Sequence, residues 1–175
     1  MADSSDKPAL RAGSEDGVIF RAADPSDESA IREILLESKL PLHAIRQPVN
    51  PDLHSPHLPS PHLHSIAGAY THLCEARGEI VAVLQWHDLG GEAEILNLAV
   101  SAKHRRGGFG RALLANFLQI ARQRRVDKVF LEVRESNSPA LALYDSQGFE
   151  RSGRRLSYYH DPEEAALLLE IKLTA

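Results

Sequence analysis

The chain has 175 residues, of which 43% are hydrophobic and 25% are charged, a size and balance that suit one globular domain able to bury about two-thirds of its unfolded surface. With 24 acidic and 20 basic residues the formal net charge is −4, so the chain as a whole has no general attraction for nucleic acid or anionic lipid. A single cysteine excludes an intrachain disulfide, and no apolar stretch approaches the roughly 20 residues needed to cross a bilayer.

The N-terminal segment differs from the rest of the chain. Residues 1–17 are polar and acidic, and they lack the basic and apolar regions of a secretory signal. We expect a flexible tail here, followed by one domain over residues 18–175. The absence of a signal favours a cytoplasmic location.

A strand and a helix are expected to open the domain. Residues 18–21 suit a short first strand. Asp24 then predicts a helix start as the capping residue, with Pro25 in the first position, where the missing N–H of proline costs nothing. The helix is expected to end near Ser38. The apolar residues that recur at helical spacing are Ile31, Ile34 and Leu35.

Residues 41–66 interrupt the regular structure. Six of the ten prolines and five of the nine histidines lie here, and proline is excluded from helix interiors and central strands. Imidazoles can hold a transition metal, but the intervening prolines supply neither the rigid elements nor the supporting hydrogen bonds that fix such ligands. We therefore expect a loop beside a binding cleft and no metal site. Whether this segment binds a metal after all, or acts as a lid, stays open. The histidines concerned are His54, His57, His62 and His64.

Three strands are expected next. Residues 69–76 and 79–86 predict a hairpin that turns at residues 77–78, and residues 92–100 predict the following strand. Cys74 lies in the first of these strands. Because no catalytic His or Asn signature surrounds it, we interpret it as a small packed residue and not as a nucleophile.

A glycine-rich loop after the third strand is the most informative feature of the chain. Its sequence is Arg105-Arg106-Gly107-Gly108-Phe109-Gly110-Arg111, and residues 112–121 predict an amphipathic helix directly after it. At a helix N-terminus, unpaired N–H groups and the positive end of the macrodipole point outward, and glycines let a phosphate approach them. The loop therefore predicts an anion site.

The pattern of this loop narrows the choice of anion. A nucleoside triphosphatase needs Gly-x-x-x-x-Gly-Lys-Ser/Thr and a dinucleotide site needs Gly-x-Gly-x-x-Gly, and this loop has neither. Basic residues around the glycines suit a pyrophosphate, although a solvated basic face is the alternative. A nucleic-acid site is disfavoured because no aromatic residues are interleaved with the charges at the end of the helix. The basic residues are Lys103, Arg105, Arg106, Arg111, Arg122, Arg124 and Arg125.

Another strand, turn and helix follow. Residues 129–133 predict a buried strand that carries one carboxylate, Glu132, and residues 139–144 predict a short helix. Ser138 is expected to cap this helix, with the following proline in the first position, and Gly148 is expected to stop it.

These segments together resemble a known family. The loop matches Arg/Gln-x-x-Gly-x-Gly/Ala, the pyrophosphate loop of the GNAT superfamily of acyl-CoA N-acyltransferases. Residues 93–149 resemble the ribosomal-protein alanine N-acetyltransferases (RimI type) of that superfamily, through Ala-Glu-Ile-Leu-Asn, Leu-Glu-Val-Arg and Ala-Leu-Tyr. The resemblance implies an α/β (α+β) GNAT fold, in which helices flank a mixed, mostly antiparallel sheet.

The resemblance also implies which residues act. Glu132 is the expected base for the acceptor amine and Tyr144 the expected acid for the departing thiolate. The alternatives are a structural ion pair for Glu132, with Arg134 or a neighbouring strand, and ring packing for Tyr144.

Binding residues are implied in the same way. Tyr158 and Tyr159 are expected to line the acceptor channel, or else to pack on the sheet. Asn137 is expected to bond the CoA arm, or else to act as a turn or capping side chain. The other residues expected to bind acetyl-CoA are Leu98, Ala99 and Val100 through their backbone, and Arg105, Arg106, Gly107, Gly108, Phe109, Gly110 and Arg111 around the pyrophosphate.

We therefore predict an N-acetyltransferase that transfers acetyl directly from acetyl-CoA to a primary amine in a ternary complex, with a protein N-terminal α-amine preferred. Residues 41–66 contain no Trp or Phe, whereas the RimI-type proteins carry an aromatic residue in this loop. A small-molecule amine such as an antibiotic, polyamine or amino acid therefore stays open, as does a non-catalytic CoA-binding module. The oligomeric state and the acyl-chain preference also stay open.

Overall fold

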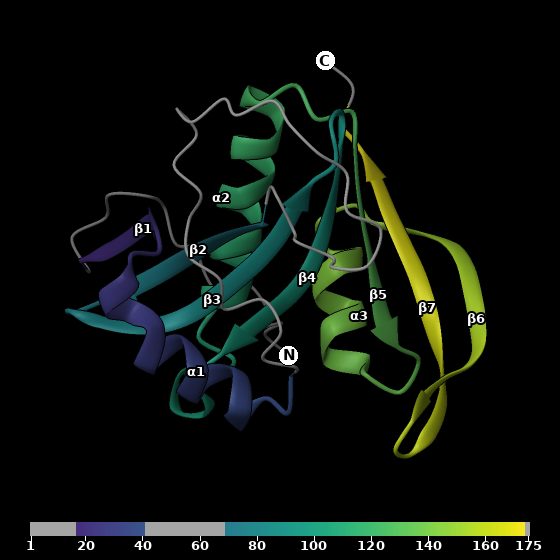
Figure 1. Ribbon diagram of the computed structural model, residues 1–175, viewed down its shortest axis with the longest axis horizontal. Coiled ribbons are helices and arrows are strands. Elements are labelled where there is room, and N and C mark those ends of the chain that lie inside the picture. The colour runs from purple at the N-terminus through teal and green to yellow at the C-terminus, as the bar shows by residue number, and fades with distance from the viewer. Residues whose placement is uncertain (1–16, 41–68, 174–175) are drawn as a thin grey trace, which may run out of the picture.

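The computed structural model describes residues 17–40 and 69–173. The predicted tail and the predicted proline- and histidine-rich loop, with the question of a metal site, lie almost wholly outside these ranges and stay predictions. Within the described chain, seven strands form one sheet in the order β1-β2-β3-β4-β5-β7-β6 (Figure 1). The strands are β1 (Val18–Ala22), β2 (Ala69–Ala76), β3 (Glu79–Asp88), β4 (Glu92–Val100), β5 (Lys128–Arg134), β6 (Glu150–His160) and β7 (Glu163–Lys172).

The sheet is mixed and mostly antiparallel, as the sequence predicts. Among the described strands, β4 and β5 pair in parallel and every other neighbouring pair is antiparallel. A parallel pair needs a crossover connection, and here the crossover contains α2 (Phe109–Gln123). The connection from β5 to β6 contains a second helix, α3 (Ser138–Asp145).

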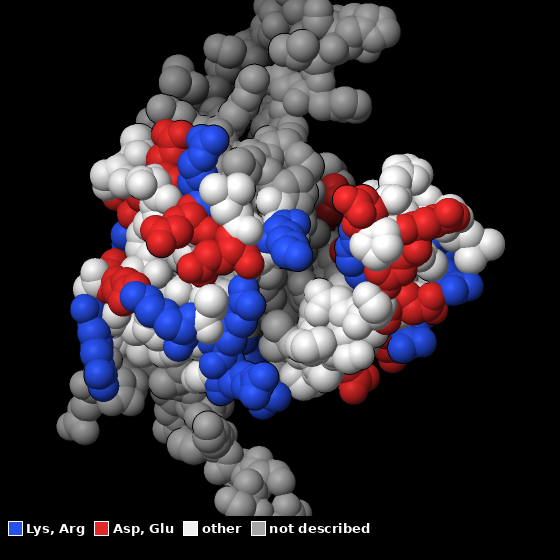
Figure 2. Space-filling model, turned by 90° about the horizontal axis from the view of Figure 1, so that it is seen from below, with Lys and Arg blue, Asp and Glu red and all other residues white. Residues whose placement is uncertain are grey.

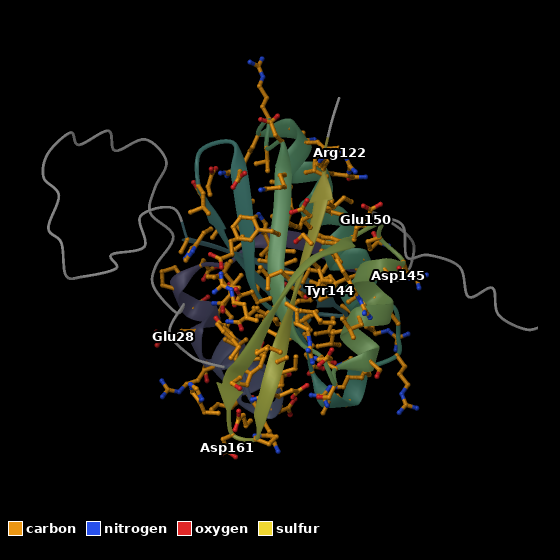
Figure 3. The ribbon with its side chains drawn as sticks, turned by 90° about the vertical axis from the view of Figure 1, so that its right-hand side faces the viewer. Glu28, Arg122, Tyr144, Asp145, Glu150 and Asp161 are labelled. Carbon is orange, nitrogen blue, oxygen red and sulfur yellow. The ribbon has the colours of Figure 1, made fainter. Side chains whose placement is uncertain are left out.

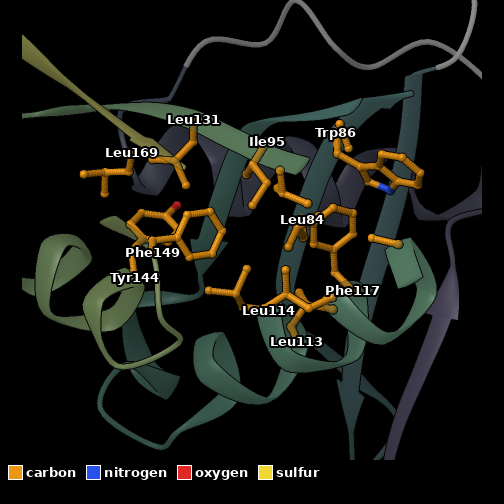
Figure 4. Close-up of a cluster of buried hydrophobic side chains, with 14 of the residues drawn as sticks. Leu84, Trp86, Ile95, Leu113, Leu114, Phe117, Leu131, Tyr144, Phe149 and Leu169 are labelled. Carbon is orange, nitrogen blue, oxygen red and sulfur yellow. The ribbon is translucent and has the colours of Figure 1, made fainter. Parts of the chain in front are cut away.

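Helices cover both faces of the sheet. Helix α1 (Glu28–Glu37) packs Ile31, Ile34 and Leu35 against one face. Helices α2 and α3 pack against the other face and bury the larger core there. Figure 4 shows part of this core, in which Trp86 lies beside Phe117, with ring centroids 5.1 Å apart. Within the described ranges, the helices are too short or too polar to cross a membrane.

The predicted cap and the predicted end of the first helix are confirmed, although its first three residues form a 3-10 turn. Asp24 accepts a hydrogen bond from the Ser26 N–H at 2.8 Å and caps a short 3-10 turn, η1 (Pro25–Asp27), that leads into α1. Ser38 closes the last turn of the helix. The local sequence decides these ends because each capping group lies within a few residues of the backbone groups that it satisfies.

The β2–β3 hairpin also follows the prediction. Arg77 and Gly78 have φ values of 54° and 77°, the two consecutive positive values that a tight two-residue hairpin turn requires. Strand β3 runs two residues past the predicted end at Trp86, to Asp88. Cys74 is fully buried in the core, and its burial raises the thiol pKa to about 11, which opposes a nucleophilic role.

Candidate active site

Strands β4 and β5 separate halfway along their length. Their parallel pairing runs only from Glu92 with Lys128 to Ile95 with Leu131, although both strands continue. On its other side β4 has a bulge, because Ile95 pairs with Trp86 but Asn97 pairs with Gln85 and leaves Leu96 as an extra residue. A bulge bends the strand that carries it. The result is a gap between β4 and β5 at their C-terminal ends.

The backbone of β4 faces this gap at alternate residues. The Ser101 N–H donates to the Val81 carbonyl of β3 at 3.0 Å, so by the two-residue period of a strand the Ala99 backbone also faces β3. The backbone groups of Leu98 and Val100 then face the gap. Of the three residues predicted to offer backbone groups to a cofactor, two are therefore placed to do so.

The glycine loop leads directly into α2. The helix begins at Phe109 and not at the predicted residue 112, because Gly108 supplies the cap with a φ of 86° that other residues rarely adopt. A Cβ atom on Gly107 would lie 2.9 Å from the Phe109 ring and 3.1 Å from the His104 carbonyl oxygen. In the described chain no side chain caps this helix end, so the backbone N–H groups of its first turn stay available to an anion.

The basic residues predicted around the loop divide into two groups. Lys103, Arg105, Arg106 and Arg111 lie at the N-terminal end of α2, and Figure 2 shows the end of the molecule that carries this loop, with Lys and Arg side chains gathered beside an uncharged surface. The other group lies about 22 Å away at the C-terminal end of the 15-residue helix. There Arg124 stacks on Tyr70 at 4.3 Å.

Arg105 of the loop forms hydrogen bonds within the protein, and Arg106 has an unusual backbone conformation. The Arg105 side chain donates to the Val100 carbonyl at 3.2 Å and to the Glu37 carbonyl at 3.4 Å, and so ties the loop to the end of α1. Arg106 takes a φ of 63°, which costs about 1–2 kcal/mol for a residue with a Cβ atom. Such strain in a loop is typical of functional sites.

Glu132 lies on the face of β5 opposite to the main core. Its neighbours Leu131 and Val133 are buried against α2 and α3, so alternation directs Glu132 to the other face. There Arg155 of β6 forms an ion pair with it, with Nη1 3.0 Å from Oε1. The Tyr158 hydroxyl lies near the same carboxylate, which raises the Tyr158 pKa to about 12.

Glu132 therefore does form an ion pair, but its partner is neither Arg134 nor a residue of a strand that pairs with β5, because Arg155 lies on β6, beyond β7. Arg134 pairs instead with Glu164 at 3.2 Å and lies 4.0 Å from the Tyr159 ring centroid. Arg155 was not predicted as a site residue. Its contact depends on the β6–β7 register, which local sequence does not reveal.

Tyr144 lies in the core, between α3 and the sheet. Its side chain is 6% exposed, and its ring packs edge-on against Phe149 at 5.4 Å. Figure 4 shows the hydroxyl directed toward Leu131 and Leu169, and Figure 3 shows Tyr144 in the middle of the molecule. Burial raises the pKa of this phenol far above its usual value, and the nearby Tyr159 adds to the shift.

Asn137 caps α3. Its Oδ1 accepts a hydrogen bond from the Ala140 N–H at 3.2 Å, so the predicted cap, Ser138, is wrong and that residue is the first of the helix. Asn137 reaches the free N–H groups from one residue earlier, as an N-cap must. Gly148 follows the helix with a φ of 87°, as predicted for its stop. The site thus combines a gap between β4 and β5, a glycine loop whose helix has no side-chain cap, and a carboxylate in an ion pair.

Comparisons with known proteins agree with this geometry. Residues 30–149 match the model of a family described as the acetyltransferase (GNAT) family. The [ribosomal protein bS18]-alanine N-acetyltransferase of Escherichia coli is 39% identical over 85 residues, which are 47% of this chain and 57% of the relative. The N-alpha-acetyltransferase 30 of Mus musculus is 31% identical over 156 residues, which are 85% of this chain and 43% of the relative. The chain thus spans about half the length of these relatives.

A solved structure is similar over almost the whole chain. The crystal structure of the ribosomal-protein-S18-alanine N-acetyltransferase from Escherichia coli superimposes with a TM-score of 0.70 and 25% sequence identity. The match covers 90% of this chain and 95% of that chain. The predicted fold is therefore confirmed.

Proposed function

This chain belongs to the acetyltransferase (GNAT) family, and from that premise we propose that it transfers the acetyl group of acetyl-CoA to a primary amine in a ternary complex. The observation that carries the proposal is the position of the uncapped glycine loop beside the gap between β4 and β5, with Glu132 on the strand that forms the far side of the gap. The anion site suits the pyrophosphate of the cofactor, the open strand edge suits its pantetheine arm, and the carboxylate suits removal of a proton from the amine.

The residues present fit acetyl-CoA. The N–H groups of Gly108 and the first turn of α2 suit its pyrophosphate. A glycine at position 107 lets the loop pack closely against the Phe109 ring and the His104 carbonyl. Arg106 and Arg111 add positive charge at the same end of the helix. The backbone groups of Leu98 and Val100 suit the amide groups of the pantetheine arm. The Asn137 side chain caps α3. Its contact with the CoA arm is part of this proposal.

The proton transfers are assigned to two side chains. Acetyl-CoA supplies the activated thioester, so the protein has to deprotonate the acceptor and protonate the departing sulfur. Glu132 accepts a proton from the amine, directly or through water, as the N–C bond forms. Tyr144 donates its proton to the thiolate as the C–S bond breaks. The raised pKa of Tyr144 keeps the phenol protonated until that step.

A protein N-terminal α-amine is the proposed acceptor. An α-amine with a pKa near 8 is roughly 10% neutral at pH 7, whereas a lysine amine near 10.4 is neutral to less than about 0.1%. One carboxylate therefore suits the α-amine better. The names of the two relatives, one an alanine N-acetyltransferase and one an N-alpha-acetyltransferase, support the same choice. Tyr158 and Tyr159, beside Glu132, are proposed to contact the acceptor, and a cytoplasmic location is part of the proposal.

An acceptor panel tests this proposal. Peptides with different first residues, the same peptides with a blocked N-terminus, an internal-lysine peptide, free amino acids, polyamines and an aminoglycoside are each incubated with acetyl-CoA, and CoA release is measured. We expect turnover on an Ala-initiated peptide, its loss when the N-terminus is blocked, and little turnover on lysine. Faster acetylation of a small amine than of every peptide would replace the peptide acceptor. No turnover on any amine, with acetyl-CoA still bound, would favour a non-catalytic module.

A further inference from the structure

The edge of the sheet beside Glu132 contains an irregularity in β6. Arg155 and Tyr159 are both paired with β7, but the three residues between them, 156–158, stand opposite a single residue of β7. Ser157 takes a φ of 50° inside this bulge. Bulges that redirect side chains are common next to active sites.

The two ends of the bulge bring their side chains to one carboxylate. The Arg155 guanidinium lies 3.0 Å from Glu132 Oε1, and the Tyr158 hydroxyl lies near the same carboxylate. The guanidinium carbon of Arg155 also lies 5.7 Å from the Tyr158 ring centroid. The Arg155 side chain is 57% exposed and that of Glu132 is 19% exposed. The cation is therefore the more exposed member of the pair, and we expect an acceptor to approach from the solvent on this side.

The charge of Arg155 affects the protonation of an arriving amine. A lone carboxylate would stabilise the ammonium form, which has no lone pair and cannot attack a thioester. A cation at the same place offsets that attraction and favours the neutral amine, as a neighbouring cation does for reactive lysines. We propose that Arg155 is a positioning residue that fixes the Glu132 carboxylate and keeps the bound acceptor amine neutral. This inference rests on the proposed function.

The other charges on this face are engaged elsewhere. Arg134 on β5 pairs with Glu164 of β7, and on β4 the carboxylate of Glu94 lies 3.6 Å from His87. Tyr158 and Tyr159 on β6 both have a raised pKa, so they are neutral at neutral pH. Among the described residues, Arg155 is therefore the cation that contacts Glu132.

The test compares Arg155→Met with Arg154→Met. Arg154 is the adjacent residue, is similarly exposed and pairs with Glu135, so its variant loses the same charge without touching Glu132. On an Ala-initiated peptide we expect Arg155→Met to lower kcat about tenfold at pH 7 without raising the acceptor KM, and to move the rising limb of the pH–rate profile about one unit higher. Arg155→Lys should restore much of kcat, and Arg154→Met should match the wild type.

A binding measurement separates this inference from the proposed function. Calorimetry with the Ala-initiated peptide and CoA at pH 6.5 needs no turnover, and we expect binding to Arg155→Met at least as tight as to the wild type, because an uncompensated carboxylate attracts the ammonium. Weaker binding, or a pH–rate profile that overlays the control, would overturn the role of Arg155. An inactive wild type would instead overturn the proposed function. The calorimetric comparison of Arg155→Met with the wild type would then still test the role of Arg155.

Discussion

Glu132 and Tyr144 have opposite surroundings, and each surrounding suits one proton transfer. Tyr144 lies among apolar side chains, and burial raises its pKa, so it holds its proton. Glu132 lies on the other face of β5 beside the Arg155 guanidinium, which stabilises a carboxylate. The two groups thus lie on opposite faces of β5, one buried among apolar side chains and one in an ion pair, as suits the acid and the base that we propose.

Substitutions at these two residues test the assignment. Glu132→Gln and Tyr144→Phe should each lower kcat by about 100-fold or more while acetyl-CoA affinity stays nearly unchanged. Activity of Glu132→Gln should recover partly at alkaline pH, where the amine loses its proton unaided. The control is Glu135→Gln, which changes an exposed carboxylate that pairs with Arg154. Steady-state kinetics from pH 6 to pH 10 would measure all three, and unchanged profiles would assign the chemistry to other residues.

At the scale of elements, a buried histidine joins β2 and β3. His72 is 8% exposed, and its Nδ1 accepts a hydrogen bond from the Trp86 Nε1–H at 3.1 Å, which requires the neutral ring with its proton on Nε2. Burial lowers the His72 pKa to about 4, with a smaller contribution from the charge of Arg124. The folded protein therefore binds a proton at this residue more weakly than the unfolded chain does.

This difference predicts a loss of stability in mild acid. Between pH 6.5 and pH 4 the unfolded state binds a proton that the folded state does not, so the free energy of unfolding falls as the pH falls through this window, by roughly 3 kcal/mol for His72 alone. Urea unfolding at pH 7, 5.5 and 4.5 measures the slope. His72→Asn, which keeps an acceptor for Trp86, should flatten it, and the exposed His160→Asn should leave it unchanged. Equal slopes in all three proteins would contradict the prediction.

Most element ends could be predicted from the sequence, whereas the bulges could not. Both ends of β2 and β4 and the C-terminal end of α1 were predicted to within a residue, because alternation, helical spacing and capping depend on near neighbours. The start of α2 was predicted three residues late because Gly108 was assigned to the loop and not to the cap. Bulges at Leu96 and in residues 156–158 were not predicted, because a bulge is defined by the register of the partner strand.

At the scale of the whole molecule, the site exists only once distant segments have assembled. The loop at Gly107 and Gly108 is local and was predicted from its residues. The gap beside it depends on the bulge in β4, which is defined by the register of β4 against β3. The partnership of Glu132 with Arg155 joins β5 to β6 across β7. The resemblance to a family supplied the roles of residues, but the charges that surround them became visible only in the assembled sheet.

Binding of acetyl-CoA across the gap should stabilise the whole fold, because the ligand contacts α2 and β4 only in the folded state. At a hundredfold excess over the dissociation constant the stabilisation is about 2.7 kcal/mol, which raises the Tm by about 5 to 10 °C for a chain of this size. Gly108→Asp should remove the shift by placing a side chain and a negative charge against the pyrophosphate. Gly78→Asp is the control, because Gly78 has a similar positive φ in the β2–β3 turn and should lower the Tm while keeping the shift. A wild type without any shift would rule out the acetyl-CoA site.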